Sequence, residues 1–282
     1  MSQAISLHLG LNAVDAHVYK GWSGPLRGCE NDARAMQAIA HARGFTSRLL
    51  LGSDATRPNL LAAMDRAAAD LAADDLLLLT YSGHGASLQD RNGDEPDQRD
   101  EAWCLHDGLL IDDEIHHRLC MFAAGVRVLV VSDSCFSGSV TREDQTTPTT
   151  TPVRRPAALR NGSAATPGRR APAARVRAIL RANADEYAAR KAAVAATQAV
   201  EPVAGIIILL AACEDLQTAH DGELHGLFTA ALLAIWNAGA FAGGHDAFLA
   251  AIRPRVGAAQ TPTLFPVGAV EPAFLAARPF TP

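Results

Sequence analysis

LLLLTYSGHG at residues 76–85 and VRVLVVSDSCFSGS at residues 126–139 decide the fold of this chain. Each stretch opens with a run of apolar residues of the length of a buried strand and closes with small and polar residues. Further apolar runs are bounded in the same way by polar or turn residues. The predicted strands are Ile5–Leu11, Arg48–Leu51, Asp75–Tyr81, Val126–Ser132 and Gly205–Ala212.

Segments with helical periodicity lie between and after these strands. Asn59–Ala73 is rich in Ala and Leu and follows the helix-start signals Thr56 and Pro58. An alternation of strands and helices predicts a parallel sheet that helices cover on both faces. The other predicted helices are Asn31–Arg43, Ala182–Ala199, Gly226–Trp236 and His245–Arg253.

The composition limits the classes of function. Of 282 residues, 49% are hydrophobic and 20% are charged, and the formal net charge is −5. Such a chain can bury one sizeable core, so we expect a single domain. The net negative charge argues against binding of nucleic acid or of an anionic membrane surface.

Neither a secretion signal nor a membrane helix is evident. The opening stretch MSQAISLHLGLNAV lacks a basic region and a cleavage site, and no apolar run approaches the roughly 20 residues of a membrane span. The cysteines show no CxxC spacing, which argues against a disulfide framework and a zinc site. We therefore expect a cytoplasmic protein. The cysteines are Cys29, Cys104, Cys120, Cys135 and Cys213.

A segment rich in Thr, Pro, Ala and Arg interrupts the pattern at residues 141–180. Its low content of aromatic and branched apolar residues predicts an exposed, flexible connection. The chain is thus divided into a larger part at 1–140, this linker, and a smaller part of the same domain at 181–282.

His84 and Cys135 lie in the polar ends of the stretches 76–85 and 126–139. In open parallel sheets, sites form beyond the carboxyl ends of the strands, so both side chains are expected in one crevice. An imidazole beside a thiol can generate the thiolate nucleophile and protonate the leaving amine. The backbone amides of Gly85 and Cys135 are candidates for the oxyanion hole. Taken singly, a cysteine after a strand is more often a small buried residue, and a histidine near a turn is more often structural.

The two stretches resemble a known family. YSGHG at 81–85 and DSCFSGS at 133–139 are similar to the His and Cys blocks of metacaspases and their bacterial relatives, within the caspase-like cysteine peptidases of family C14. Four weaker matches run in the same order along the chain. They are LRGCENDARAM at 26–36, GDEPDQRDEAWCLHD at 93–107, GLLIDDEI at 108–115 and AACEDLQTAHDGELHGLFTAALL at 211–233.

The resemblance implies a basic specificity pocket beside the His84 and Cys135 dyad. It makes Asp32, Ser82 and Asp133 the lining of the pocket for the residue before the cut bond. Carboxylates in a desolvated pocket attract a guanidinium strongly, so cleavage after Arg or Lys is expected. The alternative is that Asp32 borders a helix start and that Asp133 accepts backbone hydrogen bonds.

The sequence departs from the family pattern in places. Phe136 follows the nucleophile, where metacaspases commonly carry His, and the Gln-Ala-Cys pattern of animal caspases is absent. Cys29 stands where some relatives have a second cysteine, and simple packing is its other interpretation. Asp215 and Asp221 either shape the substrate groove or are ordinary loop residues.

The resemblance also points to calcium as an activator, although the chemistry requires no cofactor. Asp100, Asp112 and Asp113 correspond to calcium-binding positions in some metacaspases. A further expected ligand falls near Arg142, with Glu143 and Asp144 close by, and a solvated acidic loop is the alternative. A second pattern, Asp90, Asn92, Asp94 and Glu101, imitates an EF-hand loop but has Gly93 misplaced.

Arginines in the linker are candidates for self-processing. An extended, accessible chain is the form that a protease cleaves, and an Arg-rich solubilising tether is the alternative. The candidate positions are Arg154, Arg155, Arg160, Arg169 and Arg170.

Together these features predict a caspase-like α/β/α sandwich around a mainly parallel six-stranded sheet. The expected activity is hydrolysis of protein or peptide substrates through a thioester, by a monomer or a weakly self-associating protein. Two alternatives stay open. One is the same dyad with a non-basic preference for a dedicated partner protein, and the other is a catalytically idle scaffold.

Overall fold

The computed structural model describes residues 2–89, 99–135, 168–198, 205–214, 217–267 and 271–282. A six-stranded sheet forms its centre, with strand order β2-β1-β3-β7-β8-β9. β1 to β3, β7 and β8 pair in parallel, and β9 pairs antiparallel with β8 at one edge. These strands are β1 Ala4–Gly10, β2 Thr46–Leu51, β3 Leu76–Ser82, β7 Arg127–Asp133, β8 Ile206–Ala211 and β9 Thr263–Val267.

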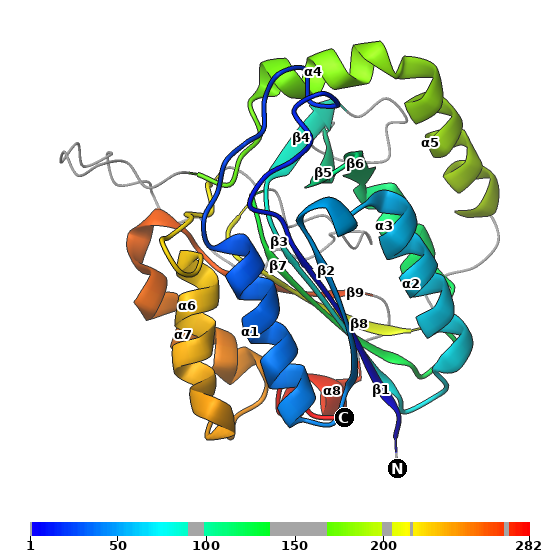
Figure 1. The fold of residues 1–282 in the computed structure, drawn as a ribbon. Helices are drawn as coiled ribbons and strands as arrows, with labels where there is room; N and C mark the ends of the chain where they lie inside the picture. Colours follow the sequence, from blue (N-terminus) through cyan, green and yellow to red (C-terminus); the bar gives the residue numbers. More distant parts are fainter. Residues whose placement is uncertain (1, 90–98, 136–167, 199–204, 215–216, 268–270) are drawn as a thin grey trace.

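Helices cover both faces of this sheet (Figure 1). One face packs on α1, α6, α7 and α8, and the other packs on α2 and α3. The strands in the middle are buried along their whole length, which explains their unbroken apolar runs. The helices are α1 Cys29–Ala42, α2 Arg57–Asp70, α3 Asp112–Cys120, α6 Leu227–Trp236, α7 His245–Val256 and α8 Pro272–Ala276.

The predicted α/β/α sandwich with a mainly parallel six-stranded sheet is confirmed. The sequence did not reveal a second, antiparallel sheet of three strands, in the order β4-β5-β6. These strands contain charged residues and lie beside the site rather than in the main sheet. Their bounds are β4 Gly85–Gln89, β5 Arg99–Leu105 and β6 Gly108–Ile111.

Part of the predicted linker is ordered. α4, Ala173–Ala182, begins inside the stretch expected to be flexible, and Val176 and Ile179 on this helix lie in the core. α5, Ala184–Gln198, follows at once. The expectation of an exposed, flexible connection is therefore wrong for Arg169, Ala171 and the buried side of α4, because α4 has an apolar side that the composition of the whole segment obscures.

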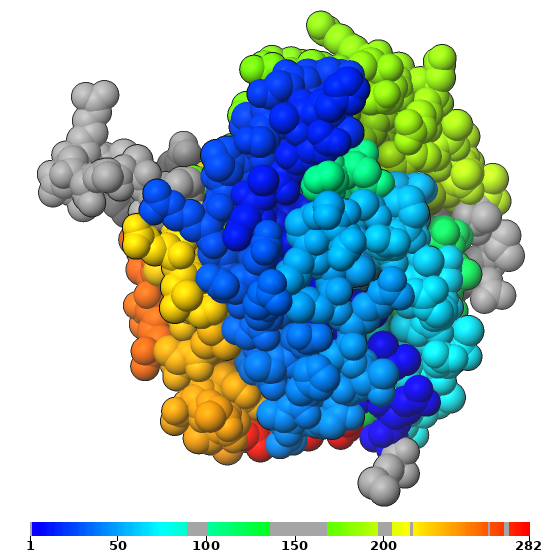
Figure 2. Space-filling model, viewed as in Figure 1, coloured from blue at the N-terminus to red at the C-terminus, as the bar shows by residue number. Residues whose placement is uncertain are grey.

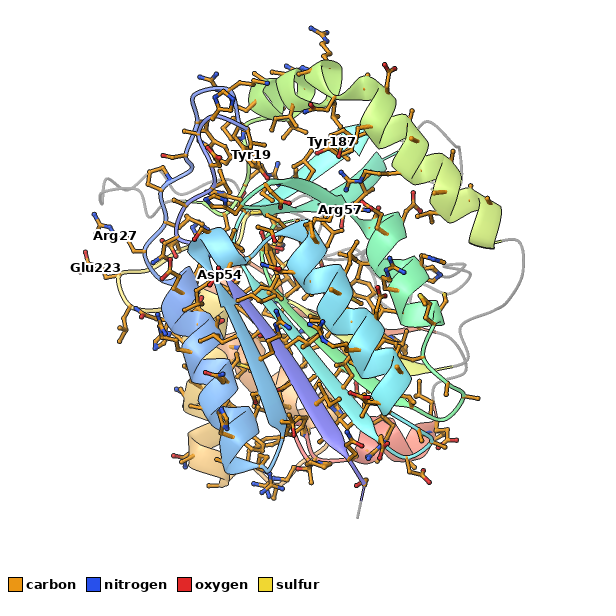
Figure 3. The ribbon with its side chains drawn as sticks, turned by 45° about the vertical axis from the view of Figure 1, so that its right-hand side comes forward. Tyr19, Arg27, Asp54, Arg57, Tyr187 and Glu223 are labelled. Carbon is orange, nitrogen blue, oxygen red and sulfur yellow. The ribbon has the colours of Figure 1, made fainter. Side chains whose placement is uncertain are left out.

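Polar contacts tie α4 and α5 to the rest of the molecule. Tyr187 on α5 accepts a 3.0 Å hydrogen bond from the backbone amide of Leu109. Arg190 on α5 and Arg57 on α2 both pair with Glu114, and Figure 3 shows Tyr187 and Arg57 near one another. Figure 2 shows the dark-blue N-terminal segment beside the light-green helices, where Arg175 donates to the carbonyl of Lys20.

Across the described ranges, no helix combines the length and the apolar character required to cross a membrane.

Candidate active site

His84 and Cys135 lie at the same edge of the main sheet. Ser82 at the end of β3 is in register with Asp133 at the end of the adjacent parallel strand β7. His84 and Cys135 each follow this pair by two residues. The backbone of Gly85 packs against Cys135 so closely that a Cβ on Gly85 would lie 1.8 Å from the Cys135 carbonyl oxygen. A glycine is therefore required here.

The segment before α1 holds the imidazole of His84. The Nε2 atom lies 2.9 Å from the carbonyl oxygen of Gly24, and the ring lies 4.8 Å from that of Trp22. Gly24 has a φ of 54° and leaves no room for a side chain, since a Cβ would lie 2.8 Å from Nε2. A carbonyl oxygen only accepts, so Nε2 carries the hydrogen and Nδ1 is the basic nitrogen.

This basic nitrogen is buried and has no hydrogen-bond partner among the described residues. Burial lowers the pKa of His84 to about 4, although the bond to Gly24 opposes the shift. The imidazole is therefore neutral at neutral pH and able to accept a proton.

The thiol of Cys135 has a different environment from the other buried cysteines. Its Sγ atom accepts a 3.2 Å hydrogen bond from the backbone amide of Ala219. Burial alone would raise the pKa of Cys135, but hydrogen bonds from Cys213 and Ala219 and the charge of Arg170 outweigh it, and the pKa is lowered from 9.0. At Cys29, in contrast, burial raises the pKa to about 12. Cys135 is therefore far more readily ionised than Cys29.

An arginine from the predicted linker fills a pocket of acidic residues next to this thiol. Arg169 is 0% exposed. Its Nη2 atom lies 2.8 Å from Oδ2 of Asp32 and 2.9 Å from Oδ1 of Asp221. Its Nη1 atom donates to Oγ of Ser82 at 2.8 Å and lies 3.0 Å from Oδ1 of Asp133. We call these four partners the acidic pocket.

The acidic pocket is assembled from distant parts of the chain. Asp32 lies on α1, Ser82 ends β3, Asp133 ends β7, and Asp221 follows β8. The structure therefore brings together the three residues that the sequence assigned to the specificity pocket. Asp221 is the fourth partner. The sequence had allowed two interpretations of this residue, as part of the substrate groove or as an ordinary loop residue.

Further contacts hold the carboxylates in place. Asp32 accepts from Nδ1 of His225 and from the amide of Gly226, while α1 has Gly28 as its N-cap and no side-chain cap. Burial opposes ionisation of Asp32, yet the bond from His225 and the charge of Arg169 outweigh it and lower the pKa of this carboxyl. Asp32 thus lies in the first turn of α1, as the helix-start interpretation has it, but its carboxylate binds Arg169, His225 and Gly226 and does not cap the helix.

Asp133 and Asp221 also bind backbone amides. Asp133 accepts hydrogen bonds from the amide and the hydroxyl of Thr229. The backbone hydrogen bond expected as the alternative role of Asp133 is therefore present together with its contact to Arg169. Asp221 accepts from the amides of Arg27 and Gly28. The neighbouring pair of Arg27 and Glu223 lies at the exposed edge of this loop (Figure 3).

The backbone around Arg169 is held in the site by isolated bridges to Gly85 and His220. Its carbonyl oxygen accepts a 2.9 Å hydrogen bond from the amide of Gly85, and its amide donates to the carbonyl of Ala219 at 2.9 Å. Beyond it, the amide of Ala171 donates to the carbonyl of Gly85 at 2.9 Å. We call residues 168–171 the seated segment. The expected exposure is wrong for Arg169, whereas Arg170 is exposed. Arg154, Arg155 and Arg160 lie outside the described residues.

Of the residues predicted to bind calcium, Asp112 and Asp113 lie at the start of α3 and are not among the partners of Arg169 in the acidic pocket. Asp112 and Asp113 are buried, and Asp112 accepts from the amides of Glu101 and Asp113. The described part of the chain contains no group of three acidic, His or Cys side chains arranged to hold a metal. The side chain of Asp100 is outside this part, as are Asp90, Asn92 and Asp94. Calcium binding stays a prediction.

Sequence reasoning missed the contacts that orient His84 and Cys135. Gly24 and Trp22 fix His84, and Ala219 contacts the sulfur of Cys135. The turn signal Gly24-Pro25 was visible, but backbone carbonyls and amides act here regardless of residue type. No local pattern could have identified them.

Comparison with known proteins agrees with this geometry. A family model described as the caspase domain matches residues 13–271. Metacaspase-1A of Neurospora crassa is 35% identical over 150 residues, which cover 48% of this chain and 32% of the relative. Metacaspase-3 of Arabidopsis thaliana is 38% identical over 137 residues, covering 43% of this chain and 38% of the relative. The chain thus spans about a third of the length of such curated relatives.

Solved structures extend the likeness to nearly the whole chain. A protein of Geobacter sulfurreducens is 39% identical with a TM-score of 0.81, and the match covers 99% of this chain and 98% of that one. Caspase-1 of Spodoptera frugiperda is 12% identical with a TM-score of 0.54, covering 94% and 88%, and shares the fold. With the family model spanning almost all of the sheet and the acidic pocket, the chain belongs to the caspase domain family of cysteine peptidases.

Proposed function

We propose that this chain is a cysteine endopeptidase that hydrolyses the peptide bond after arginine, using Cys135 as nucleophile and His84 as base. The observation that carries the proposal is the position of Arg169. Its guanidinium is buried among three carboxylates, and its carbonyl oxygen is bonded to the amide of Gly85 next to Cys135. A substrate arginine bound in the same way presents its carbonyl carbon for attack.

Each chemical step uses a side chain or an amide of this site. Nδ1 of His84 takes the proton of the Cys135 thiol, and Sγ forms a bond to the carbonyl carbon while the π electrons move to oxygen. The Gly85 amide donates to this oxyanion. The C–N bond then breaks, and the leaving nitrogen takes the proton from His84. Water, deprotonated by His84, then attacks the thioester carbon. The C–S bond breaks, the sulfur takes the proton back from His84, and the carboxylic acid product leaves and ionises.

The pocket favours arginine over lysine. Two separate nitrogens of Arg169 contact partners on different elements, Asp32 and Asp221 through Nη2 and Ser82 through Nη1. The planar fork of a guanidinium satisfies such a divided set of acceptors, whereas one ammonium cannot reach all of them. Lysine is therefore the weaker substrate residue.

Reporter peptides that differ only in the residue before the cut test this function. Wild-type protein is expected to release the reporter from Arg peptides fastest, from Lys peptides more slowly, and from Asp or Leu peptides hardly at all. Cys135→Ala should abolish release, because the nucleophile is lost. Preferred hydrolysis of Asp or Leu peptides would support the alternative specificity, and no hydrolysis of any peptide would support the scaffold interpretation.

We further propose that the chain processes itself after Arg169. The support is that Arg169 already occupies the acidic pocket, in the orientation that we propose above for a substrate arginine. Intact mass measurement of purified wild-type protein should reveal two fragments that meet between Arg169 and Arg170. The Cys135→Ala protein should keep its full mass, and an uncut wild-type protein would contradict self-processing.

A further inference from the structure

The seated segment shows which side chains surround a peptide before and after the arginine. Gly168, the residue before Arg169, forms an antiparallel bridge with His220, and the amide of Arg169 donates to the carbonyl of Ala219. The peptide therefore lies alongside residues 218–220. A side chain at the position of Gly168 would have to fit against this segment.

Thr218 occupies the space that such a side chain needs. A Cβ built on Gly168 would lie 2.5 Å from Cγ2 of Thr218, whereas Cβ of Thr218 would be at an ordinary distance of 3.9 Å. Among the described residues, this methyl group is the atom that excludes a side chain at Gly168.

The position of Thr218 is fixed from both sides. The side chain of Gln217 bonds to the backbone and hydroxyl of Thr261, and the amide of Ala219 donates to Sγ of Cys135. A shift of Thr218 away from the peptide would disturb the amide that contacts the sulfur. Rotation about χ1 is also restricted, because a β-branched side chain has few allowed rotamers.

We propose that Thr218 is a specificity-determining residue that selects glycine immediately before the cleaved arginine. This inference rests on the proposed arginine-specific peptidase function and narrows its substrates to Gly-Arg sequences. A larger residue at that position would meet the Thr218 methyl group before its own arginine could reach the acidic pocket.

Paired peptides and two variants of Thr218 test the proposal. The peptides carry Gly-Arg, Ala-Arg or Leu-Arg before the reporter and are otherwise identical. For wild-type protein, kcat/KM should be at least about tenfold higher for Gly-Arg than for Ala-Arg. Thr218→Ser removes the methyl group and should bring this ratio near one. Thr218→Val keeps a methyl group at each branch and should retain the wild-type ratio.

The possible outcomes separate the two proposals. If wild-type protein cleaves Gly-Arg, Ala-Arg and Leu-Arg equally well, the role of Thr218 is wrong while the arginine specificity stands. If no arginine peptide is cleaved, the proposed function is wrong and this inference falls with it.

A stability measurement tests the same contact without catalysis. In the Cys135→Ala protein, Gly168→Ala should lower Tm, because the added Cβ would meet the methyl group of Thr218. Adding Thr218→Ser should restore most of the loss, because contacting residues are coupled in a double-mutant cycle. An unchanged or higher Tm in Gly168→Ala alone would overturn the proposed clash.

Discussion

The amide of Gly85 donates a 2.9 Å hydrogen bond to the carbonyl oxygen of Arg169. The two residues are far apart in the sequence, one after β3 and the other just before α4. Their contact joins the acidic pocket to the edge of the sheet that carries His84 and Cys135. It also accounts for the burial of a linker arginine in the middle of the candidate site.

Removing the Arg169 side chain should destabilise the fold. Asp32, Asp133 and Asp221 would then lose their shared cation, and breaking a buried ion pair from one side typically costs about 3–5 kcal/mol. In the Cys135→Ala background, urea denaturation of Arg169→Ala should show a loss of this order. Arg170→Ala, at an exposed neighbour, is the control and should change the free energy of unfolding much less. Equal effects would contradict the energetic role of the pocket.

The same arginine should compete with external peptides. If Arg169 occupies the substrate position, Arg169→Ala in protein with intact Cys135 should hydrolyse an Arg reporter without a lag. Wild-type protein that is still uncut at the start of the assay should show a lag that ends as its own chain is cut. Progress curves followed together with intact mass measure both events. A lag of equal length in the variant would show that Arg169 does not obstruct the pocket.

Asp221 should contribute to binding of arginine. Asp221→Asn keeps one of the two oxygens that accept from the amides of Arg27 and Gly28, and it removes the charge that faces the guanidinium. We expect KM for an Arg reporter to rise by about tenfold or more, in line with ~1.5–3 kcal/mol for a charged hydrogen bond. Glu223→Gln in the same loop is the control, since this carboxylate faces solvent. A KM that Asp221→Asn leaves unchanged would argue against its role.

The burial of His84 should make the protein sensitive to acid. The folded-state pKa is about 4, below the ordinary value of 6.5. Between these values the unfolded chain binds a proton that the folded chain does not. The free energy of unfolding therefore falls as the pH decreases from 6.5 to about 4, by about 3 kcal/mol at ~1.4 kcal/mol per pKa unit.

His84→Gln should flatten this part of the stability profile. Denaturation at several pH values in the Cys135→Ala background, where the chain stays uncut, would measure the difference between the proteins with and without His84→Gln. Burial lowers the pKa of His8 to about 3. The pH dependence of stability that results is the same in both proteins and cancels in their difference. Parallel profiles for the two proteins would contradict the shift at His84.

The docking of α5 should depend on Tyr187. Its hydroxyl accepts from the amide of Leu109, which would lose this partner in Tyr187→Phe. A loss of about 1 kcal/mol in unfolding free energy is expected. Glu186→Gln, at an exposed neighbouring position on the same helix, is the matched control. A stability loss in Tyr187→Phe no larger than in the control would show that the hydroxyl contributes little.

The parallel part of the sheet could be predicted because its strands are buried on both faces. Val126–Ser132 and Asp75–Tyr81 consequently read as continuous apolar runs, and the observed β7 and β3 differ from them by one residue at each end. β9 could not be predicted in this way. It is a short antiparallel edge strand of largely half-buried residues that contains Pro266.

The acidic pocket was predictable only in part. The family resemblance indicated Asp32, Ser82 and Asp133. The composition of the linker, however, predicted an exposed Arg169, whereas this side chain is buried. An isolated arginine in a Pro- and Thr-rich segment reads as exposed, because burying a charge alone is costly. The carboxylates that offset this cost come from three distant segments. The sequence around Arg169 therefore could not predict that these carboxylates surround it.

The pairing of β7 with β8 has a consequence for a chain that has been cut after Arg169. β7 would belong to one fragment and β8 to the other, yet six register pairs join them in the middle of the sheet. The fragments would migrate together in a native gel and separate in detergent. Refolding of the nicked protein would become a second-order reaction whose rate depends on concentration, whereas the uncut chain regains its structure in a first-order process.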